Sequence, residues 1–206
     1  MKSNSEYRSD ALKTLQHHWS QPVWTTVVYM IICYILSFII YLFPIMGIVI
    51  TILLMPIRYR YNQNFLLFTR FHGTGMLRTL FKGYSRMGRS TAIPLFYTLF
   101  VALWSLLLIV PGIIVACSYS MVYYVAKDYS KMSAFDCLEY SKKIMDGHKK
   151  QLFKLILGFW AWFLLCIVTM GVGLIWLLPY IRVSMASFYE DVKEEYEEQH
   201  PEAVVE

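Results

Sequence analysis

AIPLFYTLFVALWSLLLIVPGIIVACSYSMVYYVA, residues 92–126, is a run of thirty-five residues without an Asp, Glu, Lys, Arg or His. As a single helix it would be about 50 Å long, whereas the hydrocarbon core of a membrane is about 30 Å thick. Two basic residues precede the run and two follow it: Arg86, Arg89, Lys127 and Lys131. Because basic flanks favour the cytoplasmic side of a membrane, the run is predicted to form two membrane helices that turn back at Pro111 and Gly112.

The composition is typical of a membrane protein. Of the 206 residues, 57% are hydrophobic and only 16% are charged, whereas soluble domains have about 25% charged residues. The length suits one domain, so we expect a single integral membrane domain over residues 1–189. Residues 190–206 contain eight acids and one lysine and are expected to form an acidic cytoplasmic tail.

Two further pairs of apolar runs flank the central one. Val23 to Phe43 is long enough for a full crossing, and after Pro44 and Gly47 the shorter run Ile45 to Ile57 follows, either as a span or as a tilted, partly buried return leg. The third pair is separated by the turn residues Gly171 and Gly173. The three predicted hairpins cover about residues 23–59, 92–126 and 152–189.

The segment from Arg58 to Arg89 carries seven arginines and lysines and no acid, which predicts a cytoplasmic loop. Four basic residues within it recur at helical spacing and form one stripe of an amphipathic helix: Arg78, Lys82, Arg86 and Arg89. Such a stripe would bind anionic lipid headgroups at about 1 kcal/mol per residue. It could equally be a structural helix that follows the positive-inside rule, and the sequence leaves both interpretations open.

Short sequence matches suggest an internal repeat. Leu12-Lys13-Thr14-Leu15 and Leu77-Arg78-Thr79-Leu80 match at an offset of 65, and the same offset relates Gly47 to Gly112. Together with the three apolar pairs, this predicts an all-α polytopic bundle: six transmembrane helices in three hairpins, with short cytoplasmic amphipathic helices. One of these cytoplasmic helices would start at a capping box in Ser133 to Asp136.

Other residues suggest packing and anchoring. Gly112, Ala116 and Ser120 stand four apart and predict a helix-packing strip. Several tyrosines near the predicted cytoplasmic helix ends are expected to form an interfacial aromatic belt: Tyr59, Tyr61, Tyr119, Tyr123, Tyr124, Tyr180 and Tyr189. Arg182 lies within an apolar run and is interpreted as an interfacial anchor or as a site for a lipid phosphate.

Catalytic signatures do not occur in the sequence. GxSxG, HExxH and P-loop patterns are absent, and the five histidines lack metal-ligand spacing. The four cysteines have no paired spacing and are expected to be small buried apolar residues. We therefore expect no enzyme activity, no metal and no cofactor.

A set of ordered motifs resembles a known family. The motifs are Leu106 to Ile114 with its Pro-Gly pair, Tyr119-Ser120-Met121, Ser141 to Lys149, Thr169 to Leu174, Pro179-Tyr180 and Phe188-Tyr189. They resemble the bacterial integral-membrane proteins grouped as domain-of-unknown-function family 975. That family is similar in pattern to the membrane domain of some glycerophosphodiester phosphodiesterases, which implies a lipid-facing auxiliary role.

Two functional hypotheses follow. The favoured one is a non-enzymatic protein of the cell membrane, multi-pass with both termini cytoplasmic, whose basic helices engage anionic lipid headgroups, a membrane-protein partner or a second copy of the chain. The alternative is a small transporter, or transporter subunit, for an apolar or lipid-like solute, although acidic residues at membrane depth are missing. Nucleic acid is not expected as a partner.

Overall fold

The computed structural model describes residues 2–16, 18–71, 76–80, 87–107 and 109–200, and every regular element in these ranges is a helix. This confirms the all-α class. In chain order the helices are α1 (Asn4–Gln16), α2 (Ser20–Leu42), α3 (Pro44–Phe71), α4 (Met76–Leu80), α5 (Met87–Leu107), α6 (Ile109–Ser118), α7 (Val122–Asp128), α8 (Ala134–Ile144), α9 (Lys149–Leu157), α10 (Trp160–Val168) and α11 (Leu174–Gln199).

Three segments of the described chain are long and apolar enough to cross a membrane: Ser20–Leu42, Gly88–Leu106 and Lys149–Val168. The prediction of six crossings is corrected to three candidate spans, each of which is the first leg of a predicted pair. The return legs fall short for physical reasons. Helix α6 has only 10 residues, and α3 and α11 carry charged side chains along their length.

The candidate spans expose most of their apolar surface. On α2, for example, the side chains of Tyr34 and Tyr41 are 77% and 83% exposed. A helix that is apolar on all sides and is not covered by protein needs a non-aqueous surrounding. The exposure of α2 is therefore compatible with a membrane protein.

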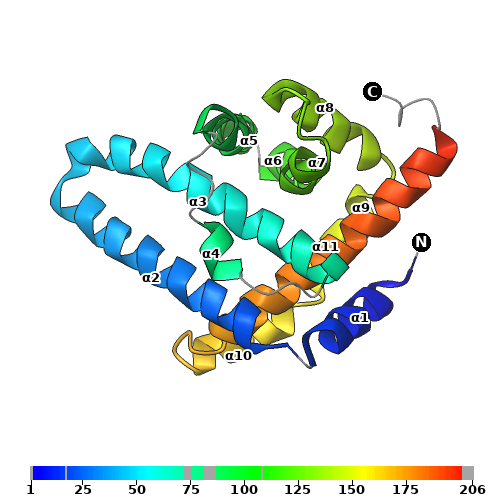
Figure 1. Ribbon diagram of the computed structural model, residues 1–206, viewed down its shortest axis with the longest axis horizontal. Coiled ribbons are helices and arrows are strands. Elements are labelled where there is room, and N and C mark those ends of the chain that lie inside the picture. Colours follow the sequence, from blue (N-terminus) through cyan, green and yellow to red (C-terminus); the bar gives the residue numbers. More distant parts are fainter. Residues whose placement is uncertain (1, 17, 72–75, 81–86, 108, 201–206) are drawn as a thin grey trace.

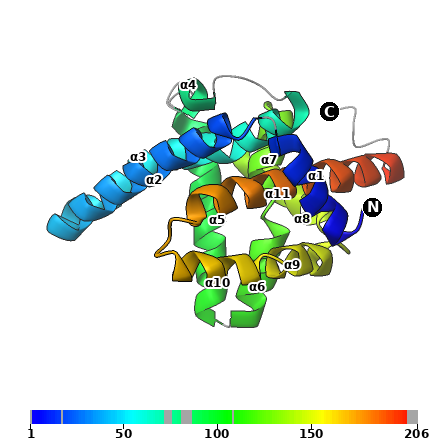
Figure 2. The ribbon, with the colours of Figure 1, turned by 90° about the horizontal axis from the view of Figure 1, so that it is seen from below.

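The helices pair along the chain but the pairs are not equivalent. Helix α2 packs against α3, α5 against α6, and α10 against α11. Figures 1 and 2 show that the α2–α3 pair and the α5–α6 pair project from the body of the molecule in different directions. The three-fold repeat consequently stays a prediction.

Two of the predicted turns are displaced. Helix α5 ends at Leu107 and α6 begins at Ile109, so Pro111 and Gly112 lie inside α6, in its first turn. Proline is tolerated there because the first N–H groups of a helix have no partner within the helix. Likewise Pro44 is the first residue of α3, and Gly47 lies within that helix.

The turn between α10 and α11 lies at the predicted glycines. Gly171 has φ +88°, in the left-handed region that glycine adopts most readily, and Met170 before it has φ 51°. Gly173 is the N-cap residue of α11.

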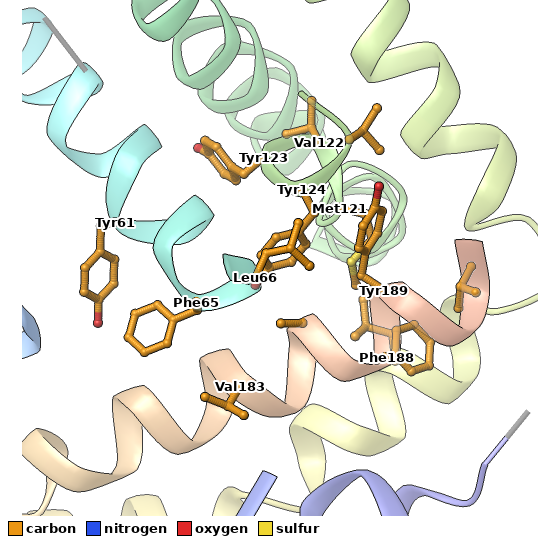
Figure 3. Packing of buried hydrophobic residues seen from close by; sticks show 14 of the residues in the cluster. Tyr61, Phe65, Leu66, Met121, Val122, Tyr123, Tyr124, Val183, Phe188 and Tyr189 are labelled. Atoms are coloured by element: carbon orange, nitrogen blue, oxygen red, sulfur yellow. The ribbon is translucent and has the colours of Figure 1, made fainter. Parts of the chain in front are cut away.

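Helix α3 extends well beyond the predicted membrane leg. The predicted loop from Arg58 to Arg89 is helical as far as Phe71, with Pro56 inside the helix. The extension is stabilised by its buried face, since Phe65, Leu66 and Phe68 belong to the core. Figure 3 shows this part of α3 meeting α7 and α11 around the core.

Most of the tyrosines predicted to form an aromatic belt are core residues. Tyr59, Tyr61, Tyr123, Tyr124, Tyr180 and Tyr189 are all less than 9% exposed. The rings of Tyr124 and Tyr189 lie 5.4 Å apart between centroids, and those of Tyr59 and Tyr123 lie 6.4 Å apart. The prediction was wrong for these residues because their rings pack against one another between helices.

The helix predicted to start at the capping box of Ser133 is confirmed as α8. The Ser133 side chain accepts from the backbone N–H of Asp136, whose carboxylate in turn accepts from the backbone N–H of Ser133. The predicted tail differs, because residues Glu190 to Gln199 continue α11 and Val192 is fully buried. The rest of the predicted tail, residues 201–206, lies outside the described residues.

Candidate functional site

The candidate lipid-binding residues do not converge on one site. Arg78 lies exposed on the short helix α4. Arg89, on α5, donates hydrogen bonds to the backbone carbonyls of Ser130 and Tyr129 just after α7. The Arg182 guanidinium lies 5.8 Å from the centroid of the Tyr61 ring, within the protein. Lys82 and Arg86, the other members of the predicted stripe, lie outside the described residues.

The helix-packing strip is only partly in tight contact. A Cβ atom on Gly112 would lie 2.5 Å from Oγ and 2.8 Å from Cα of Ser105 on α5. Ala116 and Ser120 are half-buried, and the Ser120 hydroxyl donates to the Cys117 carbonyl of its own segment. Gly112 therefore permits the close approach of α5 and α6, and the other two residues contribute less.

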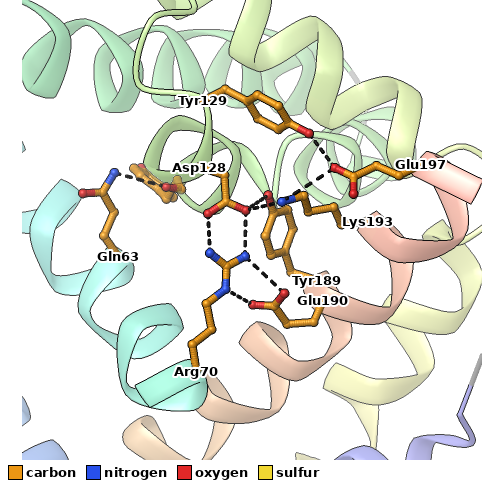
Figure 4. A network of polar contacts seen from close by, with 9 residues as sticks. Gln63, Arg70, Asp128, Tyr129, Tyr189, Glu190, Lys193 and Glu197 are labelled. Atoms are coloured by element: carbon orange, nitrogen blue, oxygen red, sulfur yellow. Dashed lines mark hydrogen bonds and ion pairs between the residues drawn. The ribbon is translucent and has the colours of Figure 1, made fainter. Parts of the chain in front are cut away.

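A polar cluster joins α3, α7 and α11 (Figure 4). The Asp128 carboxylate accepts from Arg70 Nη1 and Nη2 at 2.6 and 2.7 Å, from Lys193 Nζ at 2.8 Å and from the Tyr189 hydroxyl at 2.9 Å. Arg70 Nε also donates to Glu190 at 2.5 Å. Sequence reasoning missed this cluster, since its members are far apart along the chain.

The polar cluster has a structural role. Burial alone would raise the pKa of Asp128, but the hydrogen bonds from Arg70 and Lys193 outweigh it, and the pKa is lowered. A carboxylate that stays ionised and accepts from four donors has little capacity left to take up a proton or a ligand. The cluster thus ties three helices together.

A groove with a different character lies along α6, α9 and α10. Its first hollow, of about 420 Å³, lies between α6 and α9 and is lined by Ile113, Ile114, Cys117, Lys149, Lys150, Phe153 and Lys154. The adjoining hollow, of about 540 Å³, runs along α9 and α10 and is lined by Phe153, Ile156, Leu157, Trp160, Phe163, Leu164 and Ile167. Phe153 lines both, so the two hollows form one surface that we call the lysine-edged groove.

The groove follows from the sequence of α9. Leu152 and Leu155 turn into the core, while Phe153 and Ile156 on the other face are 44% and 40% exposed. The chain then continues into α10, where Trp160 and Ile167 are 63% and 73% exposed. These apolar side chains form a wall with lysines at one end only.

The lysines at the groove edge are largely uncompensated. Lys149 Nζ lies 3.2 Å from Asp146 Oδ1, but no acid in the described part of the chain pairs with Lys150 or Lys154. Lys149 and Lys150 occupy the first turn of α9, where the helix dipole disfavours a cation. An anion placed there would be attracted by the lysines and by the end of the helix.

A sequence signal for these lysines existed. Among the three candidate spans, only Lys149–Val168 begins with two adjacent lysines, and a third, Lys154, follows about one helical turn later. The basic stripe that starts at Arg78 has the more regular helical spacing, so the sequence pattern favours it as the lipid-binding candidate.

The fold and the groove define an all-helical protein with three helices suited to a membrane. Residues 77–196 match the family described as "Protein of unknown function (DUF975)". The match covers more than half of the chain, and the protein belongs to this family. No curated protein and no solved structure matches the chain.

Proposed function

We propose that this protein is a non-enzymatic, multi-pass protein of the cell membrane that binds an anionic phospholipid in the lysine-edged groove. The observation that carries the proposal is the arrangement of the groove, an apolar wall on α9 and α10 that ends at Lys149, Lys150 and Lys154. A phospholipid has the same order of parts, with apolar chains below an anionic headgroup.

The energies favour such an occupant. Each basic residue near an anionic membrane surface contributes about 1 kcal/mol. Acyl chains along Phe153, Trp160 and Ile167 would cover apolar surface that the protein itself leaves open. The resemblance to the membrane domain of glycerophosphodiester phosphodiesterases agrees with a lipid-facing role.

Contacts between the two ends of the chain support a topology in which both termini lie on one side of the membrane. The Tyr7 hydroxyl donates to Asp191 at 3.0 Å, and Lys2 Nζ lies 3.6 Å from the same carboxylate. Helix α1 packs along α11, and the described ends of the chain lie on the same side of the molecule in Figure 1. The basic segment from Arg58 to Arg89 favours the cytoplasm as that side.

The transporter alternative has less support. A carrier coupled to ions usually holds a buried acid that can change its protonation or its ligands. Asp128 is the buried acid of the polar cluster, and its carboxylate is occupied by Arg70, Lys193 and Tyr189. A membrane-protein partner or a second copy of the chain could bind beside the lipid.

Native mass spectrometry tests the proposal. The full chain would be released from nanodiscs of equal phosphatidylglycerol and phosphatidylcholine, and the lipids that remain bound would be counted. We expect selective retention of phosphatidylglycerol by the wild type, and at least a tenfold loss in Lys150→Glu/Lys154→Glu, about 1.4 kcal/mol in binding.

The matched control is Lys142→Glu/Lys143→Glu. It makes the same change in charge on exposed residues of α8 that do not line the groove. Equal lipid loss in both double variants would mean that net charge, not the groove, governs retention, and the groove proposal would fail. Retention of an uncharged solute in place of lipid by all three proteins would favour the transporter.

A further inference from the structure

A second cavity, of about 140 Å³, lies between α3, α5 and α7, and it shares no residue with the lysine-edged groove. One cation from each helix lines it: Arg60 from α3, Arg89 from α5 and Lys127 from α7. The remaining lining residues are uncharged, and Gln63 and Ser130 are among them. Three positive charges around one cavity without an acid in its wall attract an anion.

The two arginines retain unused donors. Arg60 Nε and Arg89 Nε are buried and have no hydrogen-bond partner among the described residues. A buried N–H without an acceptor destabilises the folded protein, and more so when the group is charged. An acceptor in the cavity that reaches either Nε would remove that cost for the arginine it contacts.

The hydrogen bonds that Arg89 makes within the protein use its two Nη atoms and leave its Nε without an acceptor. Its Nη1 donates to the Ser130 carbonyl and its Nη2 to the Tyr129 carbonyl at 2.5 Å, which ties α5 to the end of α7. These bonds hold the guanidinium in place and leave Nε over. Arg60 is held more loosely, since its Nη1 donates to Gln63 Oε1 at 3.4 Å.

Lys127 supplies the third positive charge, and its surroundings disfavour that charge. Burial, followed by the nearby Arg60 charge, lowers the pKa of Lys127, while Asp128 acts in the opposite direction. Asp128 is itself committed to Arg70, Lys193 and Tyr189. Asp128 therefore offsets only part of the positive charge at the cavity.

We propose that Arg60, Arg89 and Lys127 form a binding site for a phosphate group. Planar guanidinium forks and an ammonium group are the usual partners of phosphate oxygens. One water occupies about 30 Å³ in the liquid, so the cavity has room for a tetrahedral oxyanion. All three cations stand at the ends of apolar runs, where a lipid headgroup and a soluble phosphate could both arrive.

The test measures phosphate binding by the full chain in a neutral detergent, by isothermal titration with inorganic phosphate at constant chloride. A second arm measures retained phosphatidylglycerol by native mass spectrometry from the nanodiscs described above. We expect Arg60→Gln and Lys127→Gln each to weaken the binding of phosphate or of phosphatidylglycerol, whichever ligand the cavity holds, about tenfold. Lys131→Gln, an exposed lysine that does not line the cavity, is the matched control.

The two arms distinguish the sources of the phosphate group. Saturable binding of inorganic phosphate that only the cavity variants weaken supports a soluble ligand. Retained phosphatidylglycerol that only those variants lose supports a headgroup. If neither ligand responds to Arg60→Gln and Lys127→Gln in variants that keep wild-type circular dichroism and melting temperature, the site does not exist. Lys150→Glu/Lys154→Glu should leave phosphate binding unchanged, so the groove and the cavity are tested separately.

Discussion

Arg70 and Asp128, 58 residues apart in the chain, form two parallel hydrogen bonds, Nη1 to Oδ1 at 2.6 Å and Nη2 to Oδ2 at 2.7 Å. This is the bidentate geometry in which arginine binds a carboxylate most strongly. The pair joins the end of α3 to the end of α7, and Lys193 connects both to α11.

Replacing Arg70 by Met should destabilise the fold. The Asp128 side chain is only 8% exposed and would lose two of its donors, whereas Arg70 at 26% exposure lowers the cost somewhat. We expect a loss of about 2 to 3 kcal/mol in the free energy of unfolding. Denaturant unfolding in detergent measures it. The control is Arg78→Met, a change of an exposed side chain on α4, for which we expect a change within about 0.5 kcal/mol. Equal losses in the two variants would contradict a special role for the pair.

Stability should fall in acid through Asp128. Its pKa is lower in the folded protein than its ordinary value, so the unfolded chain takes up a proton first as the pH decreases. The stabilisation is complete above about pH 5, one unit above the unfolded pKa, and is lost as the pH falls through the lower, folded pKa. Unfolding of the wild type and Asp128→Asn should therefore differ by a constant amount from about pH 5 to 8 and converge in more acidic solution. A difference that persists unchanged below about pH 3 would argue against this linkage.

The docking of α1 depends on Tyr7. Its hydroxyl donates to Asp191, and its ring lies edge-on to Phe188 at 5.3 Å between centroids. Tyr7→Phe keeps the ring and removes the hydrogen bond, at a cost of about 1 kcal/mol. Hydrogen exchange of the α1 amides should become several-fold faster, while Ser9→Ala, on an exposed hydroxyl of the same helix, should leave it unchanged. Exchange that stays at the wild-type rate in Tyr7→Phe would show that packing alone docks α1.

Two glycines on the α5–α6 pair should respond in opposite ways to alanine. At Gly112 the new methyl group would come within 2.8 Å of the Ser105 Cα, so the helices must separate, at a cost of about 1 to 3 kcal/mol. At Gly88, in the same helical pair, no atom lies within 4 Å of the new Cβ. Gly88→Ala should therefore stabilise α5 by up to about 1 kcal/mol. Thermal unfolding of both variants makes the comparison, and a harmless Gly112→Ala would refute the close approach.

The errors of prediction have a common origin. Tyr189 ends an apolar run, and this pattern predicts a position at the membrane interface. Arg70 lies in a basic segment, and that pattern predicts a loop. In the structure Tyr189 donates to Asp128, and Arg70 binds both Asp128 and Glu190. Local patterns describe how polar a segment is, but they do not identify the distant side chain that satisfies a given polar group.

Glu190 illustrates the same point for the end of the chain. A run of acids is usually a solvated tail, and the sequence contains nothing local that contradicts this. The run is nevertheless a continuation of α11, held by Arg70 at Glu190, by Tyr7 at Asp191 and by Tyr129 at Glu197. Each partner lies more than 60 residues away along the chain.

Helical class, the apolar runs and the capping box at Ser133 could be predicted from the sequence alone. Hydropathy, helical spacing and capping are properties of neighbouring residues, and folding does not change them. Only the tertiary structure brings Arg60, Arg89 and Lys127 to one cavity. It also surrounds the Asp128 carboxylate with hydrogen-bond donors from other helices. Such sites depend on which helices pack together, and that is set by the complementary shapes of many side chains at once.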